Sequence, residues 1–351
     1  MNTELLFIDT PTGHEEEIAH AAKLLREGAL VAFPTETVYG LGGLATSELA
    51  AKAIYEAKGR PSDNPLIIHI ATPEEAEPYA ITNETYYRLA RQFMPGPLTV
   101  ILPKKDTIPL SVTGGLDTVA VRCPSHPVAR ALISATGAPI AAPSANRSGR
   151  PSPTCAAHVR EDLTGRVAAI IDGGECEVGL ESTIIKLEGE RGILLRPGAI
   201  TADALSCVCE VEIAPAVTEM LAANERPLSP GMKYRHYAPR ASLVLLDGEY
   251  EAVSERMREL ACDPSVGILC HDEEVSRMPR GATLFPIGAR EDLTAQARRL
   301  FAALREADTH PALTALYAHL PTQEGMGLAL YNRCIRAAAH TVLKIEMKQK
   351  G

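Results

Sequence analysis

Two cations that could bind anionic oxygens, Lys58 and Arg60, stand on either side of a glycine. Residues 50–57 have helical composition, and Gly59 suits the position just past a helix end. Two prolines follow and prevent the helix from resuming. The apolar run over residues 66–70 has the pattern of a buried strand. The spacing predicts a loop with two fixed cations between a helix and a core strand, although a solvated helix terminus would give the same spacing.

Polar loops follow two other predicted strands. The strand expected at residues 30–33 leads into residues 34–43, which hold two threonines, a glutamate and a glycine cluster. The small-residue strand expected at residues 138–142 leads into residues 143–152, which are rich in hydroxyls, amides and glycine. Loops at strand ends of open α/β sheets commonly bind ligands, and neutral donors suit phosphate or ribose. Solvated glycine-containing turns remain the alternative for both loops.

The candidate residues all lie at predicted strand ends and share the ability to donate hydrogen bonds to an anion. The cations are Lys58, Arg60, Arg122 and Arg196, and the neutral donors are Thr35, Thr37, Ser144, Asn146 and Ser182. Arg122 would face either solvent or a ligand. The chain has no phosphate-binding P-loop, no nucleophile elbow, no zinc-protease motif and no kinase signature. These observations predict a nucleotide or phosphorylated-intermediate site that works by positioning and electrostatics rather than through a covalent nucleophile.

Length and element order predict two α/β domains. A chain of 351 residues exceeds the size of one core. Helices and strands alternate early and strands cluster later, which predicts a mixed, mainly open, twisted sheet over residues 1–215. Residues 216–240 contain prolines and glycine and are expected to form a linker. Residues 241–351 are expected to form a smaller Rossmann-like domain, without the glycine fingerprint of a dinucleotide site.

Three helix boundaries are expected from local signals. Thr46 is predicted to cap the helix that runs to Ala57. Thr72, Pro73 and Glu75 predict a helix start with a capping box. Residues 327–343 are expected to form a closing helix.

Charge and composition restrict the function and the compartment. The net charge of -9 argues against holding long nucleic acid by bulk electrostatics, while transient RNA contact stays open. The eight cysteines lack metal-site spacing and are expected to be reduced thiols. No basic leader and no apolar run long enough to cross a bilayer are found, so we expect a cytoplasmic protein without membrane contact.

Together the motifs resemble the YrdC-domain family. The resemblance rests on Lys58-x-Arg60, on Ser144-x-Asn146 and on residues 34–42, which read Pro-Thr-Glu-Thr-Val-Tyr-Gly-Leu-Gly. Residues 229–239 and the C-terminal domain resemble the long, two-domain threonylcarbamoyl-AMP synthases of that family. The resemblance covers nearly the whole chain, and it implies a first domain with a concave, positively lined cavity.

The resemblance implies the conversion of L-threonine, bicarbonate and ATP to L-threonylcarbamoyl-adenylate, pyrophosphate and water. The product would serve other proteins that transfer the threonylcarbamoyl group to the adenosine beside the tRNA anticodon. A carbamate that attacks the α-phosphate needs no enzyme nucleophile, which agrees with the residues found. Mg²⁺ would accompany ATP, although the sequence has no dedicated carboxylate cage for it.

The resemblance also implies residue roles. Lys58 and Arg60 would act on phosphate charge in catalysis. The threonine-binding residues would be Thr35, Thr37, His69, Arg122 and Ser182, with Arg122 on the carboxylate. The ATP-binding residues would be Lys58, Arg60, Asn64, Thr118, Ser144, Asn146, Ser152, Arg196, His236 and Tyr237, the last two reaching back from the linker.

Two other functions remain open at this point. One is a carbamoyl-transfer module of the hydrogenase-maturation type, whose large proteins carry an acylphosphatase and cysteine-rich zinc motifs that are not found here. The other is a non-enzymatic RNA-binding protein, against which the net charge of -9 weighs.

Overall fold

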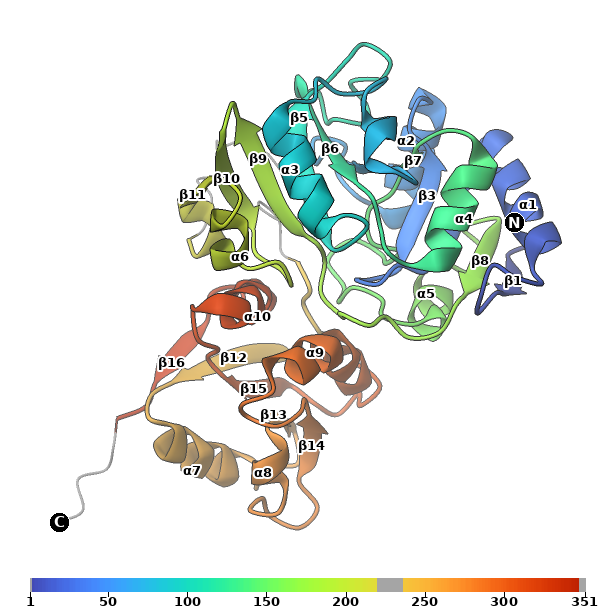
Figure 1. The fold of residues 1–351 in the computed structure, drawn as a ribbon. Coiled ribbons are helices and arrows are strands. Elements are labelled where there is room, and N and C mark those ends of the chain that lie inside the picture. Colours follow the sequence, from blue (N-terminus) through green and yellow to red (C-terminus); the bar gives the residue numbers. More distant parts are fainter. Residues whose placement is uncertain (1, 220–235, 347–351) are drawn as a thin grey trace. The chain divides into compact units, whose positions relative to one another are not determined.

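The computed structural model describes residues 2–219 and 236–346, and it divides into two α/β units (Figure 1). The first unit takes in residues 2–148 and 152–219, and the second takes in residues 149–151 and 236–346. Most of the expected linker, residues 220–235, lies outside the described residues.

A mixed eleven-stranded sheet forms the described part of the first unit, in the order β1-β8-β2-β3-β7-β4-β6-β5-β9-β10-β11. The predicted mixed sheet is therefore confirmed. The strands are β1 (Glu4–Phe7), β2 (Val31–Phe33), β3 (Gly40–Leu44), β4 (Ile67–His69), β5 (Leu98–Pro103), β6 (Thr118–Arg122), β7 (Ile140–Ala141), β8 (Ala169–Asp172), β9 (Thr183–Glu188), β10 (Arg191–Arg196) and β11 (Glu210–Ile213).

Helices cover both faces of this sheet because consecutive residues of strands such as β2 are apolar, and successive side chains point to opposite faces. On one face, α1 and α4 pack on Val31 and Phe33 of β2. On the other, α2, α3 and α5 pack on a larger core that includes Ala32 of the same strand. The helices and 3₁₀ turns are α1 (Glu15–Arg26), α2 (Glu48–Lys58), η1 (Pro73–Ala76), α3 (Glu84–Phe93), α4 (Pro127–Thr136), α5 (Ala156–Leu163), α6 (Ala202–Ser206) and η2 (Pro215–Val217).

Helix α2 begins and ends one residue later than predicted, at Glu48 and at Lys58 rather than Ala57. Gly59 takes the left-handed conformation with φ 62° just past Lys58, which confirms its predicted place after the helix end. At the start, the Ser47 hydroxyl accepts a hydrogen bond from the Ala50 amide at 3.2 Å. The prediction that Thr46 caps the helix is wrong, because Ser47 has the extended backbone that points its hydroxyl at the third helical amide.

The capping box predicted at Thr72 is also wrong. Residues Pro73–Ala76 form a short 3₁₀ turn, and the Thr72 side chain makes no cap hydrogen bond. Glu75 accepts from the Ala71 amide at 3.0 Å, one residue before the expected partner.

A parallel sheet of five strands forms the described part of the second unit, in the order β14-β13-β15-β12-β16. The expected smaller Rossmann-like domain is confirmed as a second α/β unit. Its elements are β12 (Ser242–Asp247), α7 (Tyr250–Leu260), β13 (Val266–Cys270), α8 (Asp272–Val275), β14 (Thr283–Pro286), α9 (Leu293–Ala307), β15 (Ala315–His319), α10 (Gly325–Ala337) and β16 (Val342–Lys344).

The closing helix is shorter than the predicted range of 327–343. Ala339 and His340 have φ values of 47° and 61°, which a helix cannot include. The chain then pairs as β16 with β12, so tertiary pairing overrides local helical preference. Within residues 2–219 and 236–346, no helix has the length and apolar character needed to cross a membrane.

The cap of α2 can be tested by two neighbouring substitutions. Ser47→Ala should lower the free energy of unfolding by about 1 kcal/mol, because the Ala50 amide loses its acceptor. Thr46→Ala should change it by less than about 0.5 kcal/mol. Chemical denaturation of the full chain, followed by circular dichroism, compares the two variants. A larger loss for Thr46→Ala would place the cap at Thr46 after all.

Candidate functional site

The register of the first sheet aligns polar side chains across neighbouring strands. His69 of β4 lies opposite Arg122 of β6, and Arg122 lies opposite Thr99 of β5. The Thr99 hydroxyl is 2.7 Å from the hydroxyl of Ser182, which immediately precedes β9. All four residues are buried. The sheet therefore holds His69, Arg122 and Ser182 in one row, as well as Thr99, which the sequence did not single out.

An apolar patch lies beside this polar row on the same face. Side chains two residues apart on a strand share a face, so Ile67, Ala120 and Ile101 stand next to His69, Arg122 and Thr99. These three side chains form a small cluster with Ile184 and Leu195. A few polar groups beside an apolar surface have the composition of a small-molecule site.

A buried ion pair with Glu36 holds Arg122. The Nη2 atom of Arg122 lies 2.7 Å from Oε1 of Glu36, and the two side chains are 5% and 3% exposed. The other carboxylate oxygen accepts from the Ser125 amide at 3.2 Å. Arg122 is thus not the solvent-exposed arginine that its position at a strand end also allowed. Its Nε atom is buried and lacks a hydrogen-bond partner among the described residues, so one donor remains for a ligand.

The hydroxyls of the two threonines beside Glu36 are hydrogen-bonded to each other with a defined donor. The Thr35 hydroxyl donates to the Val38 carbonyl at 2.6 Å and accepts from Nη2 of Arg122 at 3.3 Å. It has only one hydrogen, so in its 2.9 Å contact with the Thr37 hydroxyl, Thr37 is the donor. Thr35 therefore positions its neighbours, whereas the Thr37 oxygen keeps its acceptor capacity.

His69 is a neutral imidazole. Its Nδ1 atom donates to the Ile67 carbonyl at 3.1 Å. Burial, followed by the charge of Arg122, lowers the pKa of His69 to about 3. At neutral pH this side chain can therefore shape the site and form hydrogen bonds without adding charge.

Lys58 brings the second polar loop to the end of α2. Its Nζ donates to the main-chain carbonyls of Ser144 and Asn146, the latter at 2.5 Å. The Ser144 hydroxyl donates to Oδ1 of Asn146 at 2.5 Å. Lys58 is only 4% exposed, so it is not a solvated helix terminus. Three of the predicted nucleotide-binding residues are thereby in direct contact.

Arg60 and Asn64 belong to the loop that follows. Nη2 of Arg60 donates to the carbonyls of Asn64 and Pro65 at 3.1 and 2.9 Å, and Arg60 also lines a cavity of about 810 Å³. Asn64 is 1% exposed, yet its Oδ1 has no hydrogen-bond partner within the described ranges. An unsatisfied buried amide oxygen next to a guanidinium group suits a polar ligand.

The remaining predicted residues lie in three places. Arg196 donates to the carbonyl and hydroxyl of Ser182 at 3.0 and 3.1 Å, which joins it to the polar row. Ser152 donates to Glu181 at 2.5 Å. Thr118 begins β6 on the same face as Arg122 but four residues away, about 13 Å along the strand.

His236 and Tyr237 lie in the second unit. The Tyr237 ring is buried and packs 5.1 Å from the ring of Phe301 on α9. The guanidinium carbon of Arg333 on α10 lies 5.9 Å from the Tyr237 ring centre. These contacts of Tyr237 are with residues of the second unit.

Two residues with a clear place in the site were missed by the sequence reasoning. Glu36 was seen only as a carboxylate between two threonines, yet it is the partner of Arg122, 86 residues further along the chain. Thr99 is a hydroxyl inside an otherwise apolar strand, and that break in the apolar pattern was the available signal.

Comparison with known proteins gives a full-length match. The Sua5/YciO/YrdC family model, described as telomere recombination, matches residues 23–198, and the model described as threonylcarbamoyl-AMP synthase, C-terminal domain, matches residues 200–339. A threonylcarbamoyl-AMP synthase of Pyrococcus abyssi is 44% identical over 94% of this chain and 96% of its own. A threonylcarbamoyl-AMP synthase of Bacillus subtilis is 43% identical, over 98% of this chain and 100% of the relative. The crystal structure of P. abyssi Sua5 complexed with L-threonine has a TM-score of 0.90 at 43% identity, covering 99% of this chain and 100% of that one.

The buried ion pair predicts a strong energetic coupling. Glu36→Gln should lower the free energy of unfolding by about 3 kcal/mol, because Arg122 is left as a buried charge without a counter-charge. Adding Arg122→Met should restore part of this loss, since both charges are then gone.

Chemical denaturation of the parent, both single variants and the double variant gives the coupling energy. The control is Glu188→Gln, whose partner Lys186 lies near the surface, and it should leave the unfolding midpoint unchanged. Additive losses at Glu36 and Arg122 would contradict the coupling.

Proposed function

The chain belongs to the Sua5/YciO/YrdC family, in the two-domain form that ends in the threonylcarbamoyl-AMP synthase C-terminal domain, and we propose that it makes threonylcarbamoyl-AMP. The reaction consumes L-threonine, bicarbonate and ATP and yields L-threonylcarbamoyl-adenylate, pyrophosphate and water. The observation that carries this proposal is the buried guanidinium of Arg122, which is fixed by Glu36 and keeps one unsatisfied donor. A rigid cation with a spare donor suits a small carboxylate substrate.

Threonine is proposed to bind along the polar row. Its carboxylate accepts from Arg122, and the Thr37 oxygen is available to accept from the amine or hydroxyl of the substrate. His69 on the neighbouring strand β4 and Ser182, just before β9, flank the carboxylate, and Thr35 holds Thr37 and Arg122 in place. A complex with L-threonine is known for the P. abyssi relative, which supports this substrate.

The chemistry then needs positioning more than reactive side chains. The amine nitrogen of threonine bonds to the carbon of CO₂ or bicarbonate and gives a carbamate, and bicarbonate loses water in this step. A carbamate oxygen attacks the α-phosphorus of ATP, and the bond to pyrophosphate breaks. No covalent enzyme intermediate is required, so the rate depends on alignment and on stabilising the charge that develops on phosphate.

The nucleotide is proposed to lie across the loop cations and the hydroxyl-rich loop. Lys58 and Arg60 carry the positive charge and stabilise the phosphates in the reaction. The unsatisfied Oδ1 of Asn64 supports a polar ligand contact there. The other proposed contacts in the first unit are Thr118, Ser144, Asn146, Ser152 and Arg196.

Mg²⁺ is proposed to enter with the triphosphate rather than to occupy a protein cage. In the described part of the first unit, no group of three His, Cys, Asp or Glu side chains has metal-binding spacing. Glu36 is paired with Arg122, and Glu181 accepts from Ser152. Phosphate oxygens and water satisfy Mg²⁺ without such a cage. The residues present therefore do not fit a resident magnesium site.

The product is a mixed anhydride that hydrolyses readily, so it requires prompt use. We assign its consumption to proteins in the cytoplasm that transfer the threonylcarbamoyl group to the adenosine next to the tRNA anticodon. Direct contact of this chain with tRNA is not needed for the reaction.

The proposal is tested by incubating the purified full chain with L-threonine, bicarbonate and ATP labelled on the α-phosphate. Pyrophosphate and a labelled adenylate should form, and both should depend on threonine and bicarbonate. Lys58→Met should lower the rate about 100-fold or more, because a positioned cation at the phosphate is lost.

Lys23→Met is the matched control, since Lys23 is exposed on α1, does not line the cavity beside Arg60, and should not affect the rate. Circular dichroism confirms that each variant is folded. Pyrophosphate release that is independent of threonine, or equal rates in the two lysine variants, would contradict the proposal.

A further inference from the structure

The second unit has a crevice that the proposed reaction does not use. In its sheet, β13 and β15 are neighbours. The chain leaves β13 toward β14 at one edge, and it leaves β15 toward β16 at the opposite edge. Ligands of open parallel sheets bind where two neighbouring strands diverge in this way, at the carboxyl ends of the strands. His271 follows β13, and His319 is the last residue of β15.

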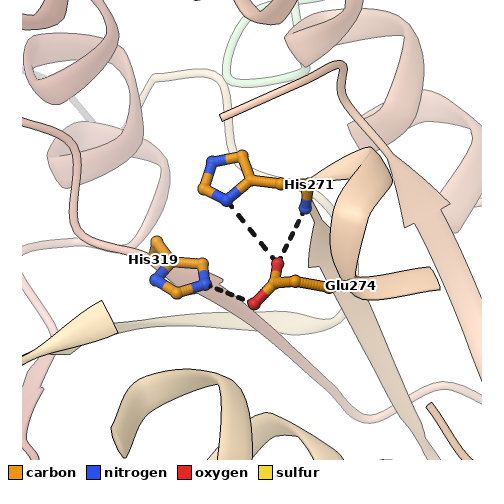
Figure 2. A group of neighbouring side chains, drawn as sticks. All are labelled: His271, Glu274 and His319. Carbon is orange, nitrogen blue, oxygen red and sulfur yellow. Dashed lines mark hydrogen bonds and ion pairs between the residues drawn. The ribbon is translucent and has the colours of Figure 1, made fainter. Parts of the chain in front are cut away.

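Figure 2 shows that these two histidines and Glu274 point toward one another. Nε2 of His319 lies 2.8 Å from Oε1 of Glu274, and Nδ1 of His271 lies 3.6 Å from Oε2. One nitrogen from each ring and one carboxylate oxygen all lie within 4.8 Å of one another. His271 and Glu274 are buried and His319 is partly buried. Three donor atoms from β13, α8 and β15 thus converge on one point.

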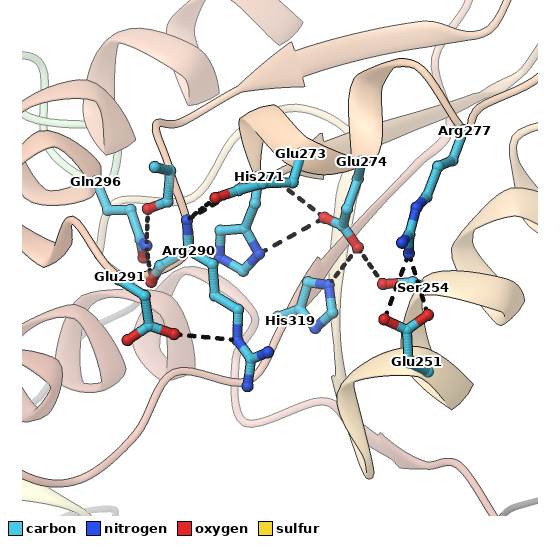
Figure 3. Close-up of polar contacts among 11 residues, drawn as sticks. Glu251, Ser254, His271, Glu273, Glu274, Arg277, Arg290, Glu291, Gln296 and His319 are labelled. Atoms are coloured by element: carbon cyan, nitrogen blue, oxygen red, sulfur yellow. Dashed lines mark hydrogen bonds and ion pairs between the residues drawn. The ribbon is translucent and has the colours of Figure 1, made fainter.

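The orientation of Glu274 is fixed by further hydrogen bonds. Its Oε1 also accepts from the Ser254 hydroxyl on α7, and its Oε2 accepts from the His271 amide at 2.8 Å (Figure 3). The carboxylate is therefore aimed at both rings.

The two imidazole rings are held by stacking. The ring centres of Tyr250 and His319 lie 4.9 Å apart with a 12° angle between the planes, and those of His271 and His319 lie 4.8 Å apart at 26°. The Nδ1 atom of His271 is buried without a hydrogen-bond partner among the described residues, and it lies 3.6 Å from a carboxylate oxygen of Glu274. A buried polar atom without a hydrogen bond calls for a partner, and a ring nitrogen beside a carboxylate suits a cation.

A cavity of about 540 Å³ opens onto the cluster. It is lined by both histidines, by Tyr250 and by Arg290, whose guanidinium carbon lies 4.1 Å from the Tyr250 ring centre. The cavity provides an entry path for an ion and space for a water or a small ligand beside it.

We propose that the second unit binds a divalent transition metal of the zinc type through His271, Glu274 and His319. Two imidazoles and one carboxylate, with a fourth position open to a cavity, form a ligand set that zinc adopts, whereas Mg²⁺ and Ca²⁺ prefer oxygen ligands alone. Zinc–nitrogen bonds of about 2.0–2.1 Å draw the two rings toward the carboxylate. The proton that His319 shares with Glu274 moves to the other ring nitrogen, or is released, as the metal binds.

The test is metal binding by the full chain, measured without reference to activity. The chain is incubated with Zn²⁺, desalted, and analysed for zinc per chain, and a chromogenic chelator measures the affinity. One zinc per chain is expected. His271→Ala and His319→Gln should each weaken zinc binding by more than about 100-fold, and Ser254→Ala, which only orients Glu274, by about 10- to 100-fold.

His310→Ala is the matched control, because His310 is exposed in the same unit and lies outside the cluster. It should bind zinc as the parent does. If a ligand variant fails to fold, the Co²⁺ absorption spectrum of the parent still decides the matter, since it distinguishes nitrogen and oxygen ligands from the sulfur of the cysteines. The proposal would be overturned if zinc did not bind stoichiometrically or if sulfur were found to ligate the metal. It would also be overturned if the parent and both folded ligand variants bound zinc equally.

Discussion

The buried ion pair of Arg122 and Glu36 is the constraint on which the site depends. Removing two charges from water is costly, so the pair is stable only where geometry and further hydrogen bonds satisfy it. The register of β4, β6 and β5 fixes the place of Arg122 between His69 and Thr99, and the loop after β2 brings Glu36 to it. The Ser125 amide and the Thr35 hydroxyl supply the hydrogen bonds. Because Glu36 uses only one side of the guanidinium, Nε is left as a rigid donor beside His69 and Thr99.

The two main cations are held in different ways, which suits two different ligands. Glu36 offsets the charge of Arg122, so this residue acts mainly by the direction of its hydrogen bonds. Lys58 donates to the main-chain carbonyls of Ser144 and Asn146, which orient its ammonium group. A directed guanidinium fits a small carboxylate, and an ammonium of this kind fits phosphate. In the proposed reaction, a carbamate formed on threonine would thus meet the nucleotide without an enzyme nucleophile.

Local patterns predicted much of the fold, because the hydrophobic periods of strands and helices can be recognised from residues that are close in the sequence. The helix end marked by Gly59 and the buried strand expected within residues 66–70 agree with the structure. The sequence could not reveal that Glu36 pairs with Arg122, since only the tertiary fold brings the loop after β2 to the last residue of β6. The glycine-rich strand β3 was expected to be a loop. A Cβ at Gly42 would lie 2.8 Å from Ile140, so glycine is needed there for packing rather than for a turn. Residue roles taken from the family resemblance stay predictions.

The central claim is that Arg122 binds the carboxylate of threonine, and calorimetric titration of two ligands into two proteins tests it most directly. L-threoninol lacks the carboxylate but keeps the amine and hydroxyl. The parent should bind L-threonine much more tightly than L-threoninol. The folded double variant Glu36→Gln with Arg122→Met should bind both equally weakly, with threonine affinity at least about 30-fold below the parent. Threonine affinity within about threefold of the parent in the double variant would contradict the account.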